Sequence, residues 1–319
     1  MTINVLGGLV AENFVDNSEN NKRRINIQKR LYDQGFTQGI QVRVGHDYTN
    51  RLLINNLIEK INSLGIPYIV HGPAENLGVD LGECFDECGK FGSYRTTEPN
   101  FNWKSFNKSA ISNAAQVANG KLSLDSRVIL HPGYSPNDKL LMNEYSERIK
   151  KVFSNELVGT PITLETIPSL VVEEDGSIPY YGFGGTAKEM QELLGDDVHE
   201  DGSGLIDFTH VGVTANQMKS LHSLFSNPQS YDKLMKDLLE LGIGRFTHFS
   251  GHTTKLWDVH DGFIIPRALD MDKQKVVKDA LKELNQKYSS EGVYVALEIN
   301  FAELEKSKRE IDTFRKQYT

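Results

Sequence analysis

The sequence is poor in cysteine. Cys84 and Cys88 are the only two cysteines among its 319 residues. Two cysteines cannot build the disulfide framework that is typical of small secreted proteins, so we expect a reducing, cytoplasmic environment. The segment Cys84-Phe-Asp-Glu-Cys88 lacks the second cysteine pair of a structural zinc site, and we expect two free thiols there.

Long hydrophobic runs and an excess of basic residues are also missing. No stretch approaches the roughly 18 uncharged apolar residues of a transmembrane helix, and residues 1–8 lack the basic and apolar regions of a signal peptide. We therefore expect no membrane partner. Lys and Arg total 35 against 43 Asp and Glu, for a net charge of -8, so the charge balance gives no sign of a nucleic-acid-binding surface. Bound metal ions would add positive charge that this count omits.

The chain does contain eight short runs rich in β-branched residues, separated by longer segments with helical periodicity. This alternation predicts a parallel sheet covered by helices. The runs are 3–7, 39–44, 68–71, 128–131, 162–165, 205–207, 246–249 and 293–298. Helices are predicted at 50–64, 137–153, 186–194, 231–241 and 273–288. Eight such units predict an α/β protein with a single (β/α)₈ TIM-barrel domain over residues 1–319, in preference to two domains.

Two connections are longer than the usual loop between a strand and a helix. They comprise residues 75–103, after the third run, and residues 168–185, after the fifth. The second contains an apparent hairpin at 171–178. Both follow the carboxyl ends of strands, so both are predicted to overhang the face where barrel enzymes have their active sites.

Six consecutive strands are predicted to end on a residue that can bind a metal ion, and three more such residues follow closely. The strand-end residues are His71, His131, Glu165, Asp207, His248 and Glu298, and the additional ones are His210, Asp258 and His260. The carboxyl ends of parallel barrel strands meet at one mouth, so these side chains should converge. Buried carboxylates and imidazoles at this density need cations. The mixture of histidines and carboxylates suits zinc or manganese better than calcium or magnesium.

These residues also carry a resemblance to a known family. In their order and type they resemble the xylose isomerase-like TIM barrels, and within them they are most similar to the endonuclease IV family of zinc-dependent abasic-site endonucleases. The resemblance covers roughly residues 68–300. The motifs are Tyr68-Ile-Val-His71, His131-Pro-Gly133, Leu164-Glu165, Asp207-x-x-His210, His248, Asp258-x-His260 and Leu297-Glu298.

The resemblance implies a phosphoester hydrolase with up to three zinc ions per chain, with Glu165 and Glu298 as catalytic residues and Glu298 also orienting the nucleophile. Manganese or magnesium stay open as alternatives. The implied ligands are His71, His131 and Glu165 for the first ion, Asp207, His248 and Glu298 with a bridging Glu165 for the second, and His210, Asp258 and His260 for the third.

The loops depart from the endonuclease IV pattern. Gly72-Pro-Ala74 replaces the residues that engage DNA in that family, and His248-Phe-Ser-Gly251 replaces its His-x-Asn-Asp. Nucleic acid is therefore left open as a partner, beside other phosphoester or sugar-phosphate substrates. The alternative is a divalent-metal sugar or sugar-phosphate isomerase or epimerase that uses Glu165, Asp207, His248 and Glu298. That alternative assigns no role to His71, His131, Asp258 and His260.

Two smaller features complete the predictions. Gly182-Phe-Gly-Gly185 before the helix at 186 is interpreted as a tight turn with Thr186 near the helix N-terminus, in preference to a phosphate cradle. His252 competes with His248 as the ligand from the seventh strand, and the alternation in 246–249 favours His248.

Overall fold

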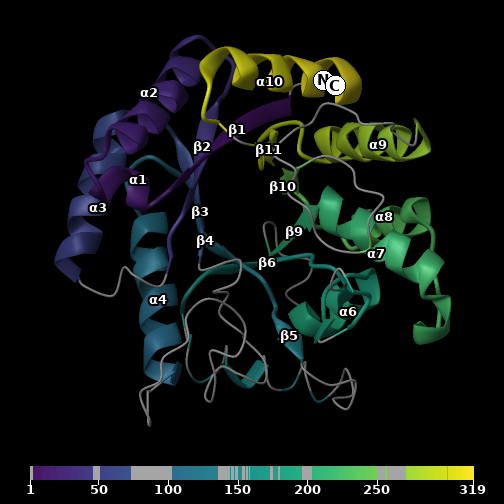
Figure 1. Ribbon diagram of the computed structural model, residues 1–319. Helices are drawn as coiled ribbons and strands as arrows, with labels where there is room; N and C mark the ends of the chain where they lie inside the picture. Colours follow the sequence, from purple (N-terminus) through teal and green to yellow (C-terminus); the bar gives the residue numbers. More distant parts are fainter. Residues whose placement is uncertain are drawn as a thin grey trace.

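Eight parallel strands close into a barrel in the computed structural model (Figure 1). The order of neighbouring strands around the barrel is β1-β11-β10-β9-β6-β4-β3-β2. The strands are β1 (Ile3–Val10), β2 (Gly39–Arg43), β3 (Tyr68–His71), β4 (Ser123–Leu130), β6 (Ile162–Glu165), β9 (Gly204–Asp207), β10 (Phe246–Phe249) and β11 (Val293–Leu297). The predicted (β/α)₈ TIM barrel is confirmed, and each predicted strand overlaps an observed one.

The structure describes most of the chain. The described residues are 3–45, 51–72, 103–135, 159–172, 175–178, 180–195, 203–250, 271–299 and 301–319, with positions 144, 147, 150–152, 155, 157 and 256. The predicted loop at 75–103 lies outside them except for Trp103, and most of the predicted helix at 137–153 lies outside them too.

Helices surround the barrel in Figure 1. They are α1 (Glu12–Val15), α2 (Glu19–Asp33), α3 (Arg51–Leu64), α4 (Trp103–Ala118), α6 (Ala187–Leu194), α7 (Phe208–Ser220), α8 (Tyr231–Glu240), α9 (Met271–Lys287) and α10 (Leu304–Tyr318), with a short 3₁₀ turn at His222–Leu224. Four predicted helices correspond to α3, α6, α8 and α9. The C-terminal α10 packs against both α9 and α2 and so completes the outer layer between the two ends of the chain.

Apolar side chains fill the barrel and form the floor beneath its mouth. One buried cluster comes from six different strands and is separate from the larger core between strands and helices. Its members are Leu6, Ile69, Ile129, Leu205, Phe246 and Ala296. Burial of these side chains stabilises the barrel, at about 1.5–3 kcal/mol for each large apolar side chain. The apolar floor also keeps water away from the lower side of the side chains at the mouth.

The predicted hairpin after the fifth barrel strand is part of a small second sheet. Its strands are β5 (Tyr134–Ser135), β7 (Leu170–Val171) and β8 (Tyr180–Gly182), in the order β5-β8-β7. Leu170 pairs with Tyr181 and Val171 with Tyr180, in antiparallel register. The hairpin is thus confirmed, and its strands extend to 170 and 182, beyond the predicted limits of 171–178.

The glycine-rich turn at 182–185 leads into a helix with a complete capping box. Thr186 is the N-cap of α6, and its Oγ1 accepts a hydrogen bond from the backbone N–H of Glu189. The carboxylate of Glu189 accepts hydrogen bonds from the N–H groups of Thr186, at 3.0 Å, and Gly184, at 3.3 Å. The backbone donors that a phosphate cradle would offer already have a carboxylate partner, so the capping interpretation is confirmed.

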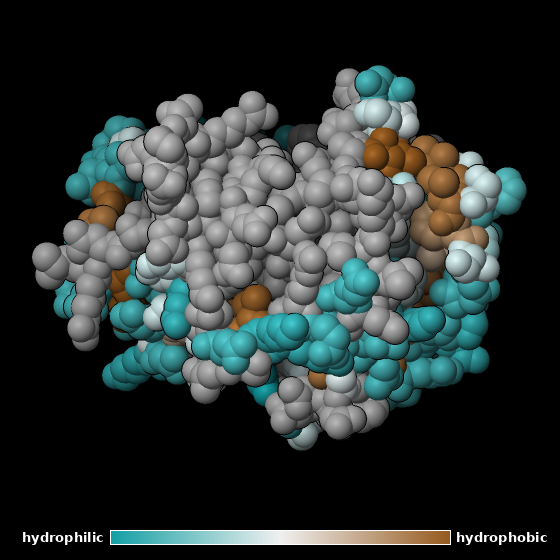
Figure 2. All heavy atoms as spheres, turned by 90° about the horizontal axis from the view of Figure 1, so that it is seen from below, coloured by the Kyte–Doolittle hydropathy of each residue, from teal (hydrophilic) through white to brown (hydrophobic). Residues whose placement is uncertain are grey.

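Among the described residues, no helix has both the length and the apolar character needed to cross a membrane. Figure 2 shows the molecule from below, where hydrophilic side chains dominate the described part of the surface and hydrophobic ones form smaller patches. Only Leu53 and Leu224 are exposed large hydrophobic residues in that described part.

Candidate metal centre

The polar side chains at the barrel mouth lie directly above its apolar floor, because alternate residues of a strand point to the same side of a sheet. Five of the six floor residues are each followed two positions later by a candidate ligand. These pairs are Ile69 and His71, Ile129 and His131, Leu205 and Asp207, Phe246 and His248, and Ala296 and Glu298. Glu165, the last residue of β6, lies at the same level. The predicted convergence at the mouth is therefore observed.

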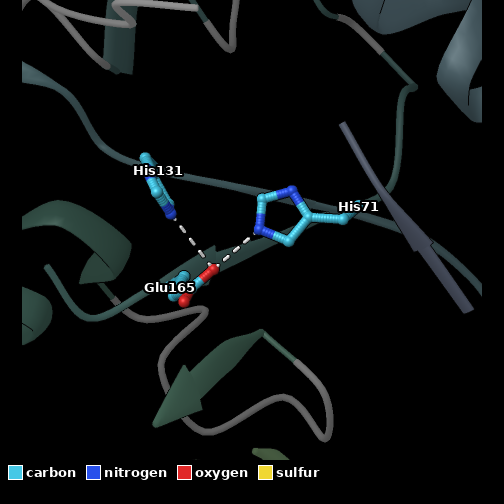
Figure 3. Close-up of side chains that lie close together, drawn as sticks. All are labelled: His71, His131 and Glu165. Carbon is cyan, nitrogen blue, oxygen red and sulfur yellow. Dashed lines mark hydrogen bonds and ion pairs between the residues drawn. The ribbon is translucent and has the colours of Figure 1, made fainter. Parts of the chain in front are cut away.

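Glu165 lies at the centre of the cluster, and Figure 3 shows two histidines that approach one of its oxygens. Oε2 is 2.9 Å from Nε2 of His71 and 3.3 Å from Nε2 of His131. Glu165 and His71 are each 1% exposed, so both lie in a medium where charge is poorly screened. The first predicted ligand set is thus brought together on one carboxylate oxygen.

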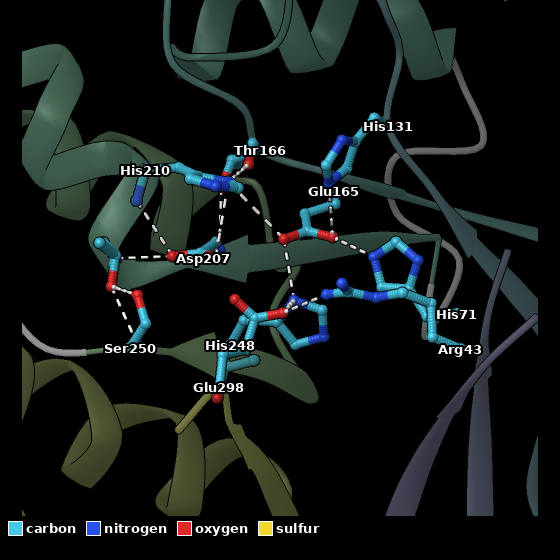
Figure 4. Close-up of polar contacts among 12 residues, drawn as sticks. Arg43, His71, His131, Glu165, Thr166, Asp207, His210, His248, Ser250 and Glu298 are labelled. Atoms are coloured by element: carbon cyan, nitrogen blue, oxygen red, sulfur yellow. Dashed lines mark hydrogen bonds and ion pairs between the residues drawn. The ribbon is translucent and has the colours of Figure 1, made fainter. Parts of the chain in front are cut away.

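The other oxygen of Glu165 faces the opposite side of the mouth (Figure 4). Oε1 lies 2.8 Å from Nδ1 of His248, and this same nitrogen is 3.7 Å from Oε1 of Glu298. The guanidinium of Arg43, at the end of β2, donates to Glu298 Oε1 over 3.3 Å. The arginine therefore holds Glu298 toward the cluster from β2, which only β1 separates from β11.

Asp207 combines two tasks at the junction between β9 and α7. Its Oδ1 caps the helix by accepting hydrogen bonds from the N–H groups of Thr209, at 2.6 Å, and His210, at 3.0 Å. Its Oδ2 accepts no hydrogen bond from the described residues although it is fully buried. Because α7 begins immediately after the strand, His210 lies in the first turn of this helix. Its Nδ1 is 3.6 Å from Oε1 of Glu165.

Hydrogen bonds to backbone carbonyls orient two of the rings. Nδ1 of His71 donates to the carbonyl oxygen of Gly72 over 2.9 Å, and Nδ1 of His210 donates to that of Thr166 over 2.8 Å. A carbonyl oxygen can only accept, so the proton is on Nδ1 in both rings. This arrangement is typical of metal-binding histidines, in which the second nitrogen is held in position by a hydrogen bond from the first.

The contact between His71 and Glu165 tests whether the site suits a cation. Burial, partly opposed by Glu165, lowers the pKa of His71 to about 4. At neutral pH the ring is therefore uncharged, with its proton on Nδ1. Nε2 then presents a lone pair to Oε2 of Glu165 at 2.9 Å, and two acceptors at this distance repel one another. A cation that accepts both as ligands removes the conflict, so the residues present fit a metal ion.

The carboxylates shift in opposite directions. Burial raises the pKa of Glu165, but the positive charges and hydrogen bonds of His248 and His131 outweigh it and hold the pKa well below its ordinary value. Burial, reinforced by Glu298 and Glu165, raises the pKa of Asp207 to about 6. For His248 burial lowers the pKa, yet the surrounding carboxylates prevail and the net shift is upward. Asp207 and His248 thus both lie in the field of neighbouring carboxylates, whose negative charge a cation would neutralise.

Seven of the nine predicted ligands lie in three overlapping groups that could each hold a metal ion, since within a group the ligand atoms are at most 4.8 Å apart. The groups are His71, His131 and Glu165; Glu165, Asp207 and His210; and Asp207, His248 and Glu298. The first and third correspond to the two predicted ligand sets that Glu165 was expected to bridge. Asp258 and His260 lie outside the described residues, as does the rival His252, so a third ion remains a prediction.

Two residues of the site were missed at the sequence level. Arg43 lies two positions after the buried Gln41 of β2, so alternation places both on the same side of the strand, but a single arginine has no characteristic motif. Thr166 accepts from the N–H of Asp207 through Oγ1, at 2.9 Å, and from His210 through its carbonyl oxygen. It links β6 to β9 and orients both neighbours, which only the three-dimensional arrangement reveals.

Comparison with known proteins supports the fold. No protein-family model and no curated protein matches the sequence. The structure is similar to the crystal structure of a D-tagatose 3-epimerase-like protein, with a TM-score of 0.54 and 14% sequence identity over 98% of this chain and 96% of that chain. It is more weakly similar to a DUF72 family protein from Enterococcus faecalis V583, with a TM-score of 0.45 and 8% identity over 97% and 94% of the two chains.

At such low identity the first likeness shows the fold alone. It supports the barrel fold and tests neither the resemblance to the xylose isomerase-like barrels nor that to endonuclease IV, so both stay predictions.

Proposed function

We propose that this protein is an enzyme, a metal-dependent hydrolase of phosphoester bonds with at least two metal ions at the barrel mouth. The observation that carries the proposal is the position of Glu165 between two sets of ligands. Its Oε2 faces His71 and His131, and its Oε1 faces His248. A carboxylate with one oxygen toward each set is suited to bridge two ions, and paired ions are typical of phosphoester hydrolases.

The bound ions would neutralise the phosphoryl oxygens and lower the pKa of the attacking water. Zinc suits the histidine-rich first set, and manganese or magnesium are the alternatives. Glu165 would hold the two ligand sets at a fixed separation. Glu298 would orient the attacking water and hold its proton, because Arg43 fixes its carboxylate at the edge of the cluster.

A second candidate is a divalent-metal sugar or sugar-phosphate isomerase or epimerase. It is favoured by the likeness to the D-tagatose 3-epimerase-like protein and by the convergence of Glu165, Asp207, His248 and Glu298. In that reaction one glutamate would remove a proton from the carbon next to a carbonyl group. This candidate leaves the contacts of His71 and His131 with Glu165 without a purpose, so we rank it second.

Metal content distinguishes the two candidates. The untagged protein, purified without chelator, would be analysed by plasma mass spectrometry and assayed on bis(4-nitrophenyl) phosphate, abasic-site DNA and a panel of ketoses. Two or three zinc-like ions per chain with phosphoester hydrolysis support the hydrolase. One ion, particularly manganese or magnesium, with ketose conversion supports the epimerase. A protein that binds no ion after supplementation refutes both.

His131→Ala separates them further, because His131 belongs only to the ligand set of the hydrolase. We expect this variant to lose one ion and its phosphoesterase activity, whereas an epimerase would keep most of its activity. His222→Ala is the control, since His222 is an exposed histidine in the 3₁₀ turn after α7. Full hydrolase activity and unchanged metal content in His131→Ala would contradict the proposal.

A further inference from the structure

A cavity of about 240 Å³ lies at the barrel mouth beside the candidate metal centre. The ends of β1, β2 and β11 form its walls, and α2 contributes one side chain. The polar groups around it are Asn13, Arg24, Gln41, Arg43 and Glu298. Glu298 belongs to both the cavity and the candidate ligand cluster, so the two spaces share a wall.

The cavity exists because β1 and β2 contribute no candidate ligand to the mouth. Leu6 of β1 belongs to the apolar floor, and the next residue on the same side of the strand is Gly8. Gly8 pairs in register with Gln41 of β2. The nearest atom that a side chain at Gly8 would meet is Cε2 of Phe301, 4.0 Å from a Cβ placed there. The missing side chain leaves open space above the floor.

The groups that face this cavity include polar atoms without a protein partner. Arg24 is half-buried, its Nε is fully buried, and it makes no hydrogen bond or ion pair with any described residue. Gln41 is 5% exposed, and its Oε1 accepts no hydrogen bond from the described part of the chain. Leaving buried donors and acceptors unsatisfied is unfavourable, so such a pair indicates that a ligand completes the site.

The charges around the cavity select the kind of ligand. Arg24 and Arg43 bring two guanidinium groups to its walls, and among the described residues that line it the one carboxylate is that of Glu298, which is ion-paired with Arg43. A guanidinium matches the geometry of phosphate oxygens, to which it can donate two parallel hydrogen bonds. Gln41 Oε1 needs a donor, and a hydroxyl group provides one.

We infer that this cavity is a substrate subsite in which Arg24 binds a phosphate group that does not itself react, while Gln41 accepts a hydrogen bond from a neighbouring hydroxyl. The substrate is then a small phosphorylated, hydroxyl-bearing molecule whose reacting end extends past Glu298 to the metal centre. The placement of the reacting end rests on the proposed function. Binding of the phosphate does not, since no candidate metal ligand other than Glu298 faces the cavity among the described residues.

Binding of inorganic phosphate, followed by ³¹P NMR or calorimetry, tests the subsite in chelator-treated and in metal-loaded protein. Arg24→Gln removes the charge and keeps a polar side chain. Its control is Arg23→Gln, the adjacent but exposed arginine of α2. We expect Arg24→Gln to weaken phosphate binding about ten- to a hundredfold in both forms, the range of charge-assisted hydrogen bonds. We expect Arg23→Gln to bind as the parent protein does.

Gly8→Ala is a second variant that leaves Arg24 in place. Its methyl group would occupy part of the cavity without a steric clash. It should weaken the binding of glycerol 3-phosphate more than that of inorganic phosphate, because the polyol needs the space next to the phosphate.

The subsite is refuted if the chelator-treated parent protein does not bind phosphate, or if both arginine variants bind it equally well. Phosphate binding without hydrolase activity would overturn the proposed function alone.

Discussion

Nε2 of His71 and Oε2 of Glu165 lie 2.9 Å apart in the interior of the barrel mouth, while Nδ1 of His71 donates to the carbonyl oxygen of Gly72. The backbone hydrogen bond places the only proton of the neutral ring on the side away from the carboxylate. The arrangement thus directs two electron pairs at one point, which is what a metal ion requires of its ligands. A solvent-exposed or purely structural ion pair would instead place the proton between the two groups.

Glu165→Gln should have the largest effect of any single ligand substitution. The amide keeps the volume of the side chain but cannot supply an anionic oxygen to each of the two ligand sets. We expect the loss of at least one ion per chain by plasma mass spectrometry and a decrease in activity of about a hundredfold or more. Glu147→Gln, at an exposed position, is the control. Unchanged metal content in Glu165→Gln would contradict the bridging role.

Metal affinity should fall as the pH decreases through about 6. Asp207, whose burial raises its pKa to about 6, and His248, whose pKa is also raised, bind a cation only after losing a proton. Below its pKa each group therefore costs about a factor of ten in affinity for each pH unit. Competition with a chromophoric chelator between pH 8 and pH 5 measures the metal affinity as a function of pH. A constant affinity over that range would show that neither residue exchanges a proton for the metal.

Removing the metal should destabilise the fold. A ligand that binds only the folded state at a hundred times its dissociation constant contributes about 2.7 kcal/mol, which for a chain of this length raises the Tm by about 4 °C. Zinc or manganese added to chelator-treated protein should produce such a shift in thermal unfolding followed by circular dichroism. The Glu165→Gln variant should show little of this increase in Tm. An equal increase in Tm for the parent protein and for Glu165→Gln would indicate that the metal binds elsewhere.

The sequence was sufficient to predict the barrel and the inward ligands, because five of the eight strands have an apolar residue followed two positions later by a candidate ligand, as in Phe246 and His248. Helix α7 was not among the predicted helices, and its burial explains why. Val211, Val213 and Ala215 are buried along with Thr214 and Gln217, so the helix has little polar face and a weak amphipathic pattern. Burial does not explain the other helices that were not predicted, α1, α2, α4 and α10, since α2 and α10 have exposed faces.

The cavity beside Glu298 was not predictable in the same way. It depends on a missing side chain at Gly8 and on the approach of Arg24 from α2, which is distant in sequence from the ligand-bearing strands. A glycine within a strand has several interpretations, such as a bulge or a close approach of another segment. Only the arrangement of β1, β2 and α2 in space shows that Gly8 leaves an open pocket, in place of a bulge or a close approach of another segment.

The capping box of α6 provides a test of local stability that is independent of metal. Thr186→Ala removes the acceptor for the N–H of Glu189 and should lower the free energy of unfolding by about 1 kcal/mol, as measured by urea denaturation of the chelator-treated protein. Glu189→Gln should lower the free energy of unfolding by less. Its amide oxygen can still accept from the N–H of Thr186, and burial of a neutral amide costs less than burial of a carboxylate. Lys188→Ala, exposed on the same helix, controls for helix propensity. If Thr186→Ala were as stable as Lys188→Ala, the box would not hold the helix start, and the backbone donors at 184–186 would again be available to an anion.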